Sequence, residues 1–174
     1  MSENGTTDKR EKLVRRALEE FEARLIGYAA SILRDADRAR DVTQDTFIKL
    51  YKQDPDKVSG ALKAWLFTVC RNRCLDILRK EKRMENIEQE QVAQIHDKSE
   101  GPSRLVERSD QHSEVMRFLE RLPENQKEVL RLKFQGEMSY KEISDVTSLS
   151  VSNVGFLIHA GLKRLRGMLS HQAA

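Results

Sequence analysis

Residues 139–154 read SYKEISDVTSLSVSNV, and this stretch decides the fold predicted for the C-terminal part of the chain. Ser139, followed three residues later by Glu142, is typical of a capping box, in which each side chain satisfies a free backbone amide at a helix start. A short turn of small polar residues follows, and Ser150 or Ser152 can cap the next helix. Two helices joined by so short a turn predict a helix-turn-helix.

The spacing within this motif supports the same prediction. A small residue, Ser144, stands where the two helices would cross, the turn residue Ser148 follows four positions later, and the aliphatic Val154 six positions after that. The second helix is predicted over residues 151–169 because apolar side chains recur on one side of it. These side chains are Val151, Val154, Ile158, Leu162, Leu165 and Leu169.

A helix-turn-helix can place its second helix in the major groove of DNA, with the N-terminal residues at the base edges. The alternative is an ordinary helical hairpin. Lys163, Arg164 and Arg166 favour DNA, because clustered cations contact phosphates and residues 146–174 contain no acidic residue to offset them.

The rest of the sequence also has helical periodicity, and no segment shows the alternation typical of a strand. Apolar residues recur at intervals of three and four over residues 8–33, 36–53 and 61–82, which predicts three helices. The segment DPDKVSG, residues 54–60, predicts a loop by its turn-forming residues. The fold class predicted is therefore all-α.

The charges are distributed unevenly, although the 174-residue chain has a net charge of only +3. Residues 71–83 hold six basic and two acidic residues, whereas residues 84–124 hold ten acidic and five basic ones. We therefore predict two small helical domains, residues 8–83 and 112–170, joined by an acidic flexible linker over residues 84–111.

Several classes of protein are excluded by the composition. No stretch approaches the roughly 18 consecutive apolar residues of a membrane span, and the N-terminal residues do not form a secretory signal, so we expect a cytoplasmic protein. The sequence offers no nucleophile–base pair, phosphate-binding glycine loop or metal-spaced cluster, so neither catalysis nor a cofactor is expected. Cys70 and Cys74 leave a metal site or redox pair open, although two core positions are the simpler interpretation.

Two polar helix faces are candidate interfaces of the N-terminal domain. Asn72, Asp76 and Arg79 follow one face of a basic helix, a pattern suited to capturing unstacked bases of a DNA strand. The preceding helix carries a second polar side, made of Asp41, Gln44, Asp45 and Lys49. That side could dock a partner helix, with a solvated surface as the alternative.

Taken together, these segments resemble an extracytoplasmic-function (ECF) sigma factor of the bacterial sigma-70 family. Residues 37–51, DRARDVTQDTFIKLY, resemble region 2.2 of that family, and residues 64–83, AWLFTVCRNRCLDILRKEKR, resemble its regions 2.3 and 2.4. Residues 119–154 resemble region 4. The resemblance covers about residues 20–83 and 112–170, and the ordered combination is far more specific than a helix-turn-helix alone.

The resemblance implies a protein that binds the clamp helices and flap of core RNA polymerase, directs it to promoter DNA and helps to open the duplex at transcription initiation. It assigns polymerase binding to Asp41, Gln44, Asp45 and Phe47. It assigns recognition and melting of the −10 element to Ser59, Gly60, Arg71, Asn72, Asp76 and Arg79. It further implies a nucleoid-associated protein and an anti-sigma factor or another targeting partner.

The recognition helix departs from the family pattern. Relatives usually carry Lys or Arg at the positions of Gly155, Leu157 and Ala160, and glycine at the position of Ser148. Without such an arginine the helix lacks the Arg–guanine contact, which contributes about 1–3 kcal/mol of discrimination. We expect −35 readout, weak or atypical, from Ser150, Ser152, Asn153 and His159, with phosphates held by Lys163 and Arg164.

One alternative function remains open from the sequence, namely a stand-alone helix-turn-helix transcriptional regulator. Such a regulator would need a dimerisation or effector domain. Residues 8–83 offer a basic, polar-faced helix instead, which favours the sigma-factor interpretation.

Overall fold

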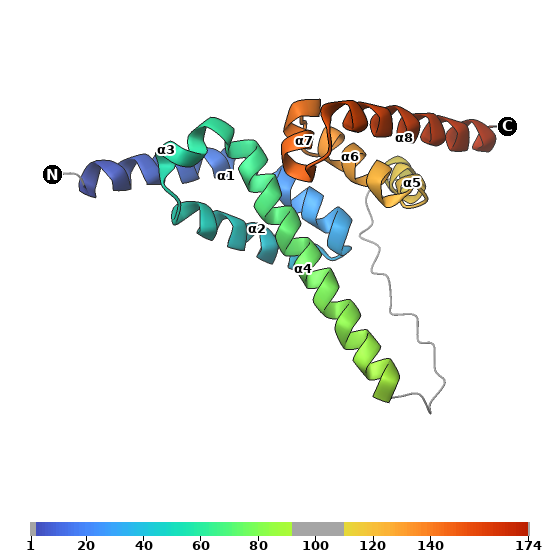
Figure 1. Ribbon diagram of the computed structural model, residues 1–174, viewed down its shortest axis with the longest axis horizontal. Coiled ribbons are helices and arrows are strands. Elements are labelled where there is room, and N and C mark those ends of the chain that lie inside the picture. The colour runs from blue at the N-terminus through green and yellow to red at the C-terminus, as the bar shows by residue number, and fades with distance from the viewer. Residues whose placement is uncertain (1–2, 92–109, 174) are drawn as a thin grey trace. The chain divides into compact units, whose positions relative to one another are not determined.

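The computed structural model describes residues 3–91 and 110–173, and every element in these ranges is helical (Figure 1). The all-α fold class is thus confirmed for the described part of the chain. Two compact units divide the molecule, the first built on helices α1 to α4 and the second on α5 to α8. Residues 92–109, which hold most of the predicted acidic linker, lie outside the described residues.

The first unit is a bundle of long helices with a short helical connection. It consists of α1 (Glu3–Leu33), α2 (Ala36–Tyr51), α3 (Pro55–Val58), the 3-10 turn η1 (Ser59–Ala61) and α4 (Leu62–Gln91). The loop predicted over residues 54–60 is wrong, because this segment forms α3 and most of η1. Asp54 caps α3 by accepting a hydrogen bond from the amide of Asp56 at 3.1 Å, and Pro55 suits the first helical position.

Helices α1, α2 and α4 bury one shared core. The ring of Tyr28 on α1 meets Phe67 on α4 edge-on, with 5.4 Å between the ring centroids. Two buried threonines of α2, Thr43 and Thr46, are tolerated there because each hydroxyl donates a hydrogen bond to a carbonyl one turn earlier, at 2.8 Å. The remaining core side chains of this unit include Phe21, Leu25, Val42, Leu50, Leu66, Cys70 and Cys74.

Helix α4 continues beyond the core that its first half covers. It ends at Gln91, past the domain end predicted at residue 83, and every residue from 82 to 91 is exposed. Figure 1 shows this half of the helix running past α1 and α2. Its glutamates and glutamines are good helix formers, which explains why the acidic composition does not end the helix.

The second unit is a compact set of four helices of different lengths. These are α5 (Asp110–Leu119), α6 (Glu124–Phe134), α7 (Tyr140–Thr147) and α8 (Val151–Gln172). Helix α6 begins directly after Pro123, a residue that favours helix starts. The core of the unit includes Leu122, Val129, Leu130, Leu132, Met138, Ile143, Val146, Val154 and Ile158.

Helices α6 and α8 approach each other closely at Gly161. A Cβ atom at this position would lie 2.8 Å from Cδ1 of Leu130, a distance that real Cβ contacts do not reach. Glycine at 161 therefore lets the two helices pack at their crossing point. Glycine at this position introduces no backbone strain, because the helix is regular there and no glycine has a positive φ among the described residues.

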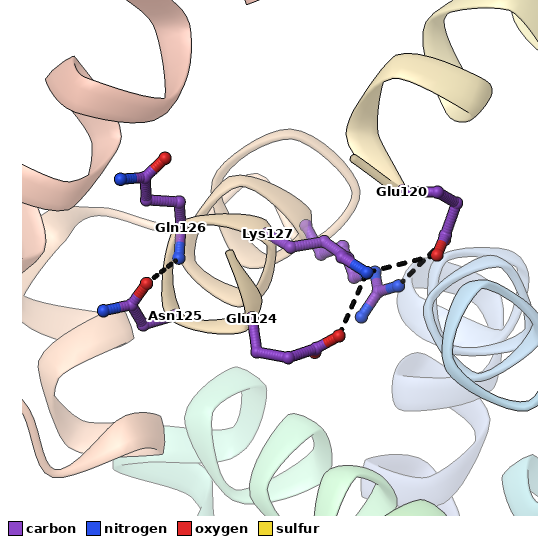
Figure 2. Close-up of polar contacts among 6 residues, drawn as sticks. Glu120, Glu124, Asn125, Gln126 and Lys127 are labelled. Carbon is purple, nitrogen blue, oxygen red and sulfur yellow. Dashed lines mark hydrogen bonds and ion pairs between the residues drawn. The ribbon is translucent and has the colours of Figure 1, made fainter. Parts of the chain in front are cut away.

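A charged cluster in this unit contains two buried cations (Figure 2). The ammonium of Lys127 donates hydrogen bonds to Glu120 at 3.1 Å and to Glu124 at 3.0 Å. The guanidinium of Arg131, one turn further along α6, donates to Glu120 at 3.3 Å. The cluster ties the start of α6 to the residues that follow α5.

Candidate functional site

The helix-turn-helix predicted from residues 139–154 is present as α7, a short turn and α8. The Ser139 hydroxyl accepts a hydrogen bond from the amide of Glu142 at 3.2 Å, which is the contact that the predicted capping box assigns to Ser139. The Ser144 hydroxyl donates to the carbonyl of Leu149 at 2.5 Å and so fixes the turn from inside. Ser148 ends α7 in the left-handed conformation, with φ of 64°.

Ser148 therefore occupies a conformation that glycine adopts with least strain. The next helix begins at Val151 and is capped by Ser150, whose hydroxyl accepts a hydrogen bond from the amide of Asn153 at 3.1 Å. Of the two caps that the sequence allowed, the structure selects Ser150.

Helix α8 presents a polar and basic face outside the core. Its exposed polar residues include Ser152, Asn153, His159, Lys163, Arg164 and Arg166. All of the −35 residues predicted from the sequence, including the capping Ser150, are exposed along this helix. Helix α8 contains no Asp or Glu, so cations and neutral hydrogen-bonding groups define its surface.

The apolar side of α8 is shorter than predicted. Val154 and Ile158 are buried as expected, but Val151 at the start and Leu169 near the end are exposed. The sequence pattern could not reveal this, because periodicity reports which side of a helix is apolar but not how far its neighbours cover it.

The resemblance implies basic residues at three positions of α8, and none of these positions is fully exposed. Leu157 is buried, so a cation at this position would replace a core side chain. Gly155 is half-buried, and a Cβ there would lie 3.3 Å from the ring of Tyr140 on α7. The same ring also interacts with Lys133, whose ammonium lies 5.5 Å from the ring centroid. Ala160 is also half-buried.

One residue that the sequence analysis missed is Phe156, which is 69% exposed on α8. It falls two positions after Val154 and so lies outside the repeat of apolar residues that marks the core. That mismatch was the available signal, since a large apolar residue off the apolar side of a helix must face solvent or a partner.

In the first unit, three of the predicted polymerase-binding residues lie together. Asp41, Gln44 and Asp45 are exposed on α2 and line one shallow groove of about 460 Å³. The other lining residues are Arg38 and Val42 of α2, and Arg73 and Ile77 of α4. The groove thus combines carboxylates, an amide, two guanidinium groups and an apolar floor.

Ion pairs across this groove fix its walls. Arg73 of α4 approaches Asp45 of α2 at 3.8 Å, and Arg38 of α2 pairs with Glu81 of α4. The fourth predicted residue, Phe47, is not part of the surface, because it is only 7% exposed and packs in the core. Its neighbour Ile48 is 49% exposed and supplies an apolar group on the outside of α2.

The −10 residues predicted from the sequence divide between two places on the first unit. Ser59 and Gly60 are exposed in η1, immediately before α4. Asn72, Asp76 and Arg79 are exposed further along α4, with Asn72 about 15 Å from the helix start at 1.5 Å per residue. Arg71 is half-buried, and Arg79 lies 3.4 Å from Asp76.

The two cysteines occupy core positions on α4. Both side chains are fully buried. A hydrogen bond with Cys74 and burial away from water raise the pKa of the Cys70 thiol far above its ordinary value, because both favour the protonated form. Within residues 3–91 and 110–173, no group of three or more His, Cys, Asp or Glu side chains is arranged to hold a metal ion.

None of the helices in the described part of the chain is both long and apolar enough to cross a lipid bilayer. The helix-turn-helix and the acid-free face of α8 define a protein of the helix-turn-helix class, with a second helical unit that adds a polar groove and a basic helix. Comparison with known proteins identifies which branch of that class it is.

Residues 17–84 match the Sigma-70 region 2 family, and residues 112–165 match the Sigma-70 region 4 family. The chain is 30% identical over 132 residues to the ECF RNA polymerase sigma factor RpoE of Cereibacter sphaeroides, which covers 76% of this chain and 70% of that protein. It is 28% identical over 143 residues to the ECF sigma factor SigM of Bacillus subtilis, covering 81% and 85% of the two chains.

Two solved structures have a similar fold. The sigma factor RpoE of Bartonella quintana, in complex with the anti-sigma factor NepR, matches with a TM-score of 0.68 and 24% identity, over 90% of this chain and 96% of that one. CnrH, in complex with the cytosolic domain of CnrY, matches with a TM-score of 0.64 and 21% identity, over 97% and 94%. The chain belongs to the ECF RNA polymerase sigma factors of the sigma-70 family.

Proposed function

We propose that this sigma factor directs core RNA polymerase to promoters through three surfaces. The α2–α4 groove docks the polymerase, η1 and α4 engage the −10 element, and the polar face of α8 contacts the −35 element. The observation that carries the proposal is that each unit presents its own exposed polar helix face, on α4 and on α8. A stand-alone helix-turn-helix regulator needs only the second face, so that alternative is not favoured.

Polymerase docking rests on the exposed acidic side of α2. Asp41 and Asp45 present carboxylates, and Gln44 between them presents an amide that can donate or accept hydrogen bonds. Phe47 supports this helix from the core, and Ile48 takes over the role of apolar contact. Such a mixture of charge and one apolar anchor suits a helix of the polymerase clamp as partner.

Engagement of the −10 element rests on the polar face of α4. Asn72 can hydrogen-bond a base edge, and Arg79 can contact the backbone of a separated strand. Ser59 and Gly60, exposed in η1, offer a small polar surface to a base flipped out of the duplex. Flipping costs a few kcal/mol of unstacking, which contacts of the polymerase with α2 would offset.

Engagement of the −35 element is weak or atypical in this proposal. Lys163 and Arg164 hold phosphates, while Ser152, Asn153 and His159 contact base edges without an arginine–guanine pair. The capping hydroxyl of Ser150 already accepts a backbone hydrogen bond and retains only its donor for DNA. Protection at −35 as strong as at −10, lost in Asn153→Ala, would contradict weak readout.

The domain organisation belongs to the same proposal. Region 2 spans residues 8–83, region 4 spans residues 112–170, and the acidic segment 84–111 connects them. In this arrangement the protein performs no chemistry of its own and works in the cytoplasm at the nucleoid. An anti-sigma factor is a proposed partner, because both structural neighbours are described in complexes, one with a named anti-sigma factor.

Run-off transcription with core polymerase on genomic fragments tests the proposal. We expect promoter-specific transcripts only when the protein is added, and co-purification of the protein with core polymerase. The double variant Asp41→Ala, Asp45→Ala is expected to weaken co-purification by roughly tenfold or more. Asp37→Ala, an exposed carboxylate at the start of the same helix, is the matched control and should bind normally.

A stand-alone regulator would give a different result. It would bind DNA without core polymerase and produce no new transcript. Equal co-purification of the double variant and the wild-type protein would contradict the docking groove while leaving promoter recognition intact.

A further inference from the structure

Phe156 is the most exposed large apolar side chain on the described chain, at 69%. It stands on α8 among short side chains, namely Ser152, Asn153, Gly155 and Ala160. Gly155 has no side chain to shield the ring. A Cβ atom at this position would lie close to the ring of Tyr140 on α7. The ring of Phe156 therefore projects further than its immediate neighbours in the first turns of the helix.

The ring lies in line with the polar and basic residues of α8. Ser152, Phe156, His159 and Lys163 follow one another at intervals of four, three and four, which places them in one row along the helix. A hydrogen-bonding hydroxyl therefore precedes the ring, and an imidazole and an ammonium follow it. A surface that hydrogen-bonds bases and contacts phosphates would carry the ring with it into the groove.

The surroundings of Phe156 favour DNA over an apolar protein partner. The other exposed apolar residue at this end of α8, Val151, is five positions away and projects in a different direction, so the two do not form a contiguous patch. No Asp or Glu occurs on α8, and Lys163, Arg164 and Arg166 follow within the next turns. Charge complementarity therefore points to a polyanion.

In the major groove only one base presents an apolar group, the C5-methyl of thymine. Among the base edges of the major groove, an uncharged ring without hydrogen-bonding atoms gains most from contact with that methyl. We propose that Phe156 determines specificity in the −35 element by packing its ring on the C5-methyl group of a thymine. This inference rests on the proposed contact of α8 with promoter DNA and names the base that α8 reads.

Replacing thymine by deoxyuridine tests the inference, because it removes the methyl group and keeps base pairing. The probe is a promoter identified by run-off transcription, with each thymine of its −35 block replaced singly, bound by holoenzyme made from the full chain and core polymerase. We expect one position where deoxyuridine weakens binding about fourfold, the effect of removing one methyl from an apolar contact.

Variants separate the ring from other causes. Phe156→Ala should bind thymine and deoxyuridine promoters equally, near the level of the wild-type protein on deoxyuridine, and Phe156→Leu should keep part of the discrimination. Phe134→Ala is the matched control, because Phe134 is a 61% exposed phenylalanine on α6 of the same unit. It should retain the full ratio between the two promoters. Because both rings are exposed, we expect all three variants to keep the wild-type thermal melting temperature.

The outcomes distinguish the inference from the function on which it rests. Promoter-specific transcription with no methyl effect at any −35 position, or with discrimination kept in Phe156→Ala, overturns the inference alone. A protein partner bound through Phe156 would produce that second pattern. If the protein supports no promoter-specific transcription, the proposed function and the inference fall together.

Discussion

Lys127 is only 5% exposed, and its ammonium lies 3.1 Å from Oε2 of Glu120. Glu120 also accepts a hydrogen bond from Arg131, which is 8% exposed, so one partly exposed carboxylate serves two buried cations (Figure 2). Lys127 has a second acceptor in the well-exposed Glu124. The cluster is therefore asymmetric, and Glu120 is the carboxylate that both cations share.

This asymmetry predicts unequal costs for removing its members. Glu120→Ala leaves two buried cations without their shared carboxylate, and we expect a loss of about 3 kcal/mol in the free energy of unfolding. Lys127→Met keeps the volume and leaves Glu120 paired with Arg131, so its cost should be about 1 kcal/mol or less. Urea denaturation of the two variants measures the difference. Equal costs would show that Glu120 does not act as the common partner.

The contact between α6 and α8 predicts opposite effects for two glycines of the same helix. In Gly161→Ala the new methyl would meet Leu130 at 2.8 Å, and overpacking should destabilise by about 1–3 kcal/mol. In Gly167→Ala the new methyl meets nothing within 4 Å, so higher helix propensity should stabilise by up to about 1 kcal/mol. Thermal denaturation of both variants provides the measurement, and stabilisation by Gly161→Ala would contradict a close crossing.

Much of the fold followed from helical spacing and capping chemistry. The periodicity of residues 8–33 and the caps at Ser139 and Ser150 specified helices that the structure contains. Residues 54–60 were misjudged because Asp and Pro favour both turns and helix starts. The exposure of Val151 depends on which helices cover each end of α8, and periodicity within one helix carries no information about that.

The candidate site was predictable where polar residues repeat at helical spacing. Asp41, Gln44 and Asp45 could be placed on one side of α2 for this reason, and they line one groove. The apolar residues of the site were harder to predict, because a large apolar residue can lie either in the core or at an interface. The resemblance implies a role in polymerase binding for Phe47, which is buried, whereas no role is predicted for Phe156, which is exposed. Only packing against the other helices separates the two cases.

The buried thiols predict a dependence of stability on pH. The hydrogen bond with Cys74 and burial raise the pKa of Cys70 above its ordinary value of 9.0, so the folded protein keeps the thiol proton that the unfolded chain loses. Above about pH 9 the unfolded state therefore binds fewer protons, and stability should fall by about 1.4 kcal/mol per pH unit from this group. Below the ordinary pKa the Cys70 thiol is protonated in both states, so it does not change how stability depends on pH.

Comparison with Cys70→Ala isolates this contribution from the other groups that titrate in alkali. We expect the free energy of unfolding of the wild-type protein to fall more steeply than that of the variant between pH 9 and 10. Urea denaturation at several pH values measures both slopes. Parallel slopes would mean that the thiol ionises as readily in the folded protein as in the unfolded chain.

Binding of promoter DNA by α8 predicts a specific dependence on salt. Lys163 and Arg164 are exposed and stand beyond the base-reading residues, where they can neutralise phosphates and release counterions. Removing either with Ala should reduce the magnitude of the slope of log binding constant against log salt by about 1, and should weaken all promoters nearly equally. Lys12→Ala, an exposed cation on α1, should leave the slope unchanged. Titrations of holoenzyme with promoter DNA over a range of salt concentrations measure these slopes. A variant that weakens one promoter far more than another would assign the cation to a base edge instead of a phosphate.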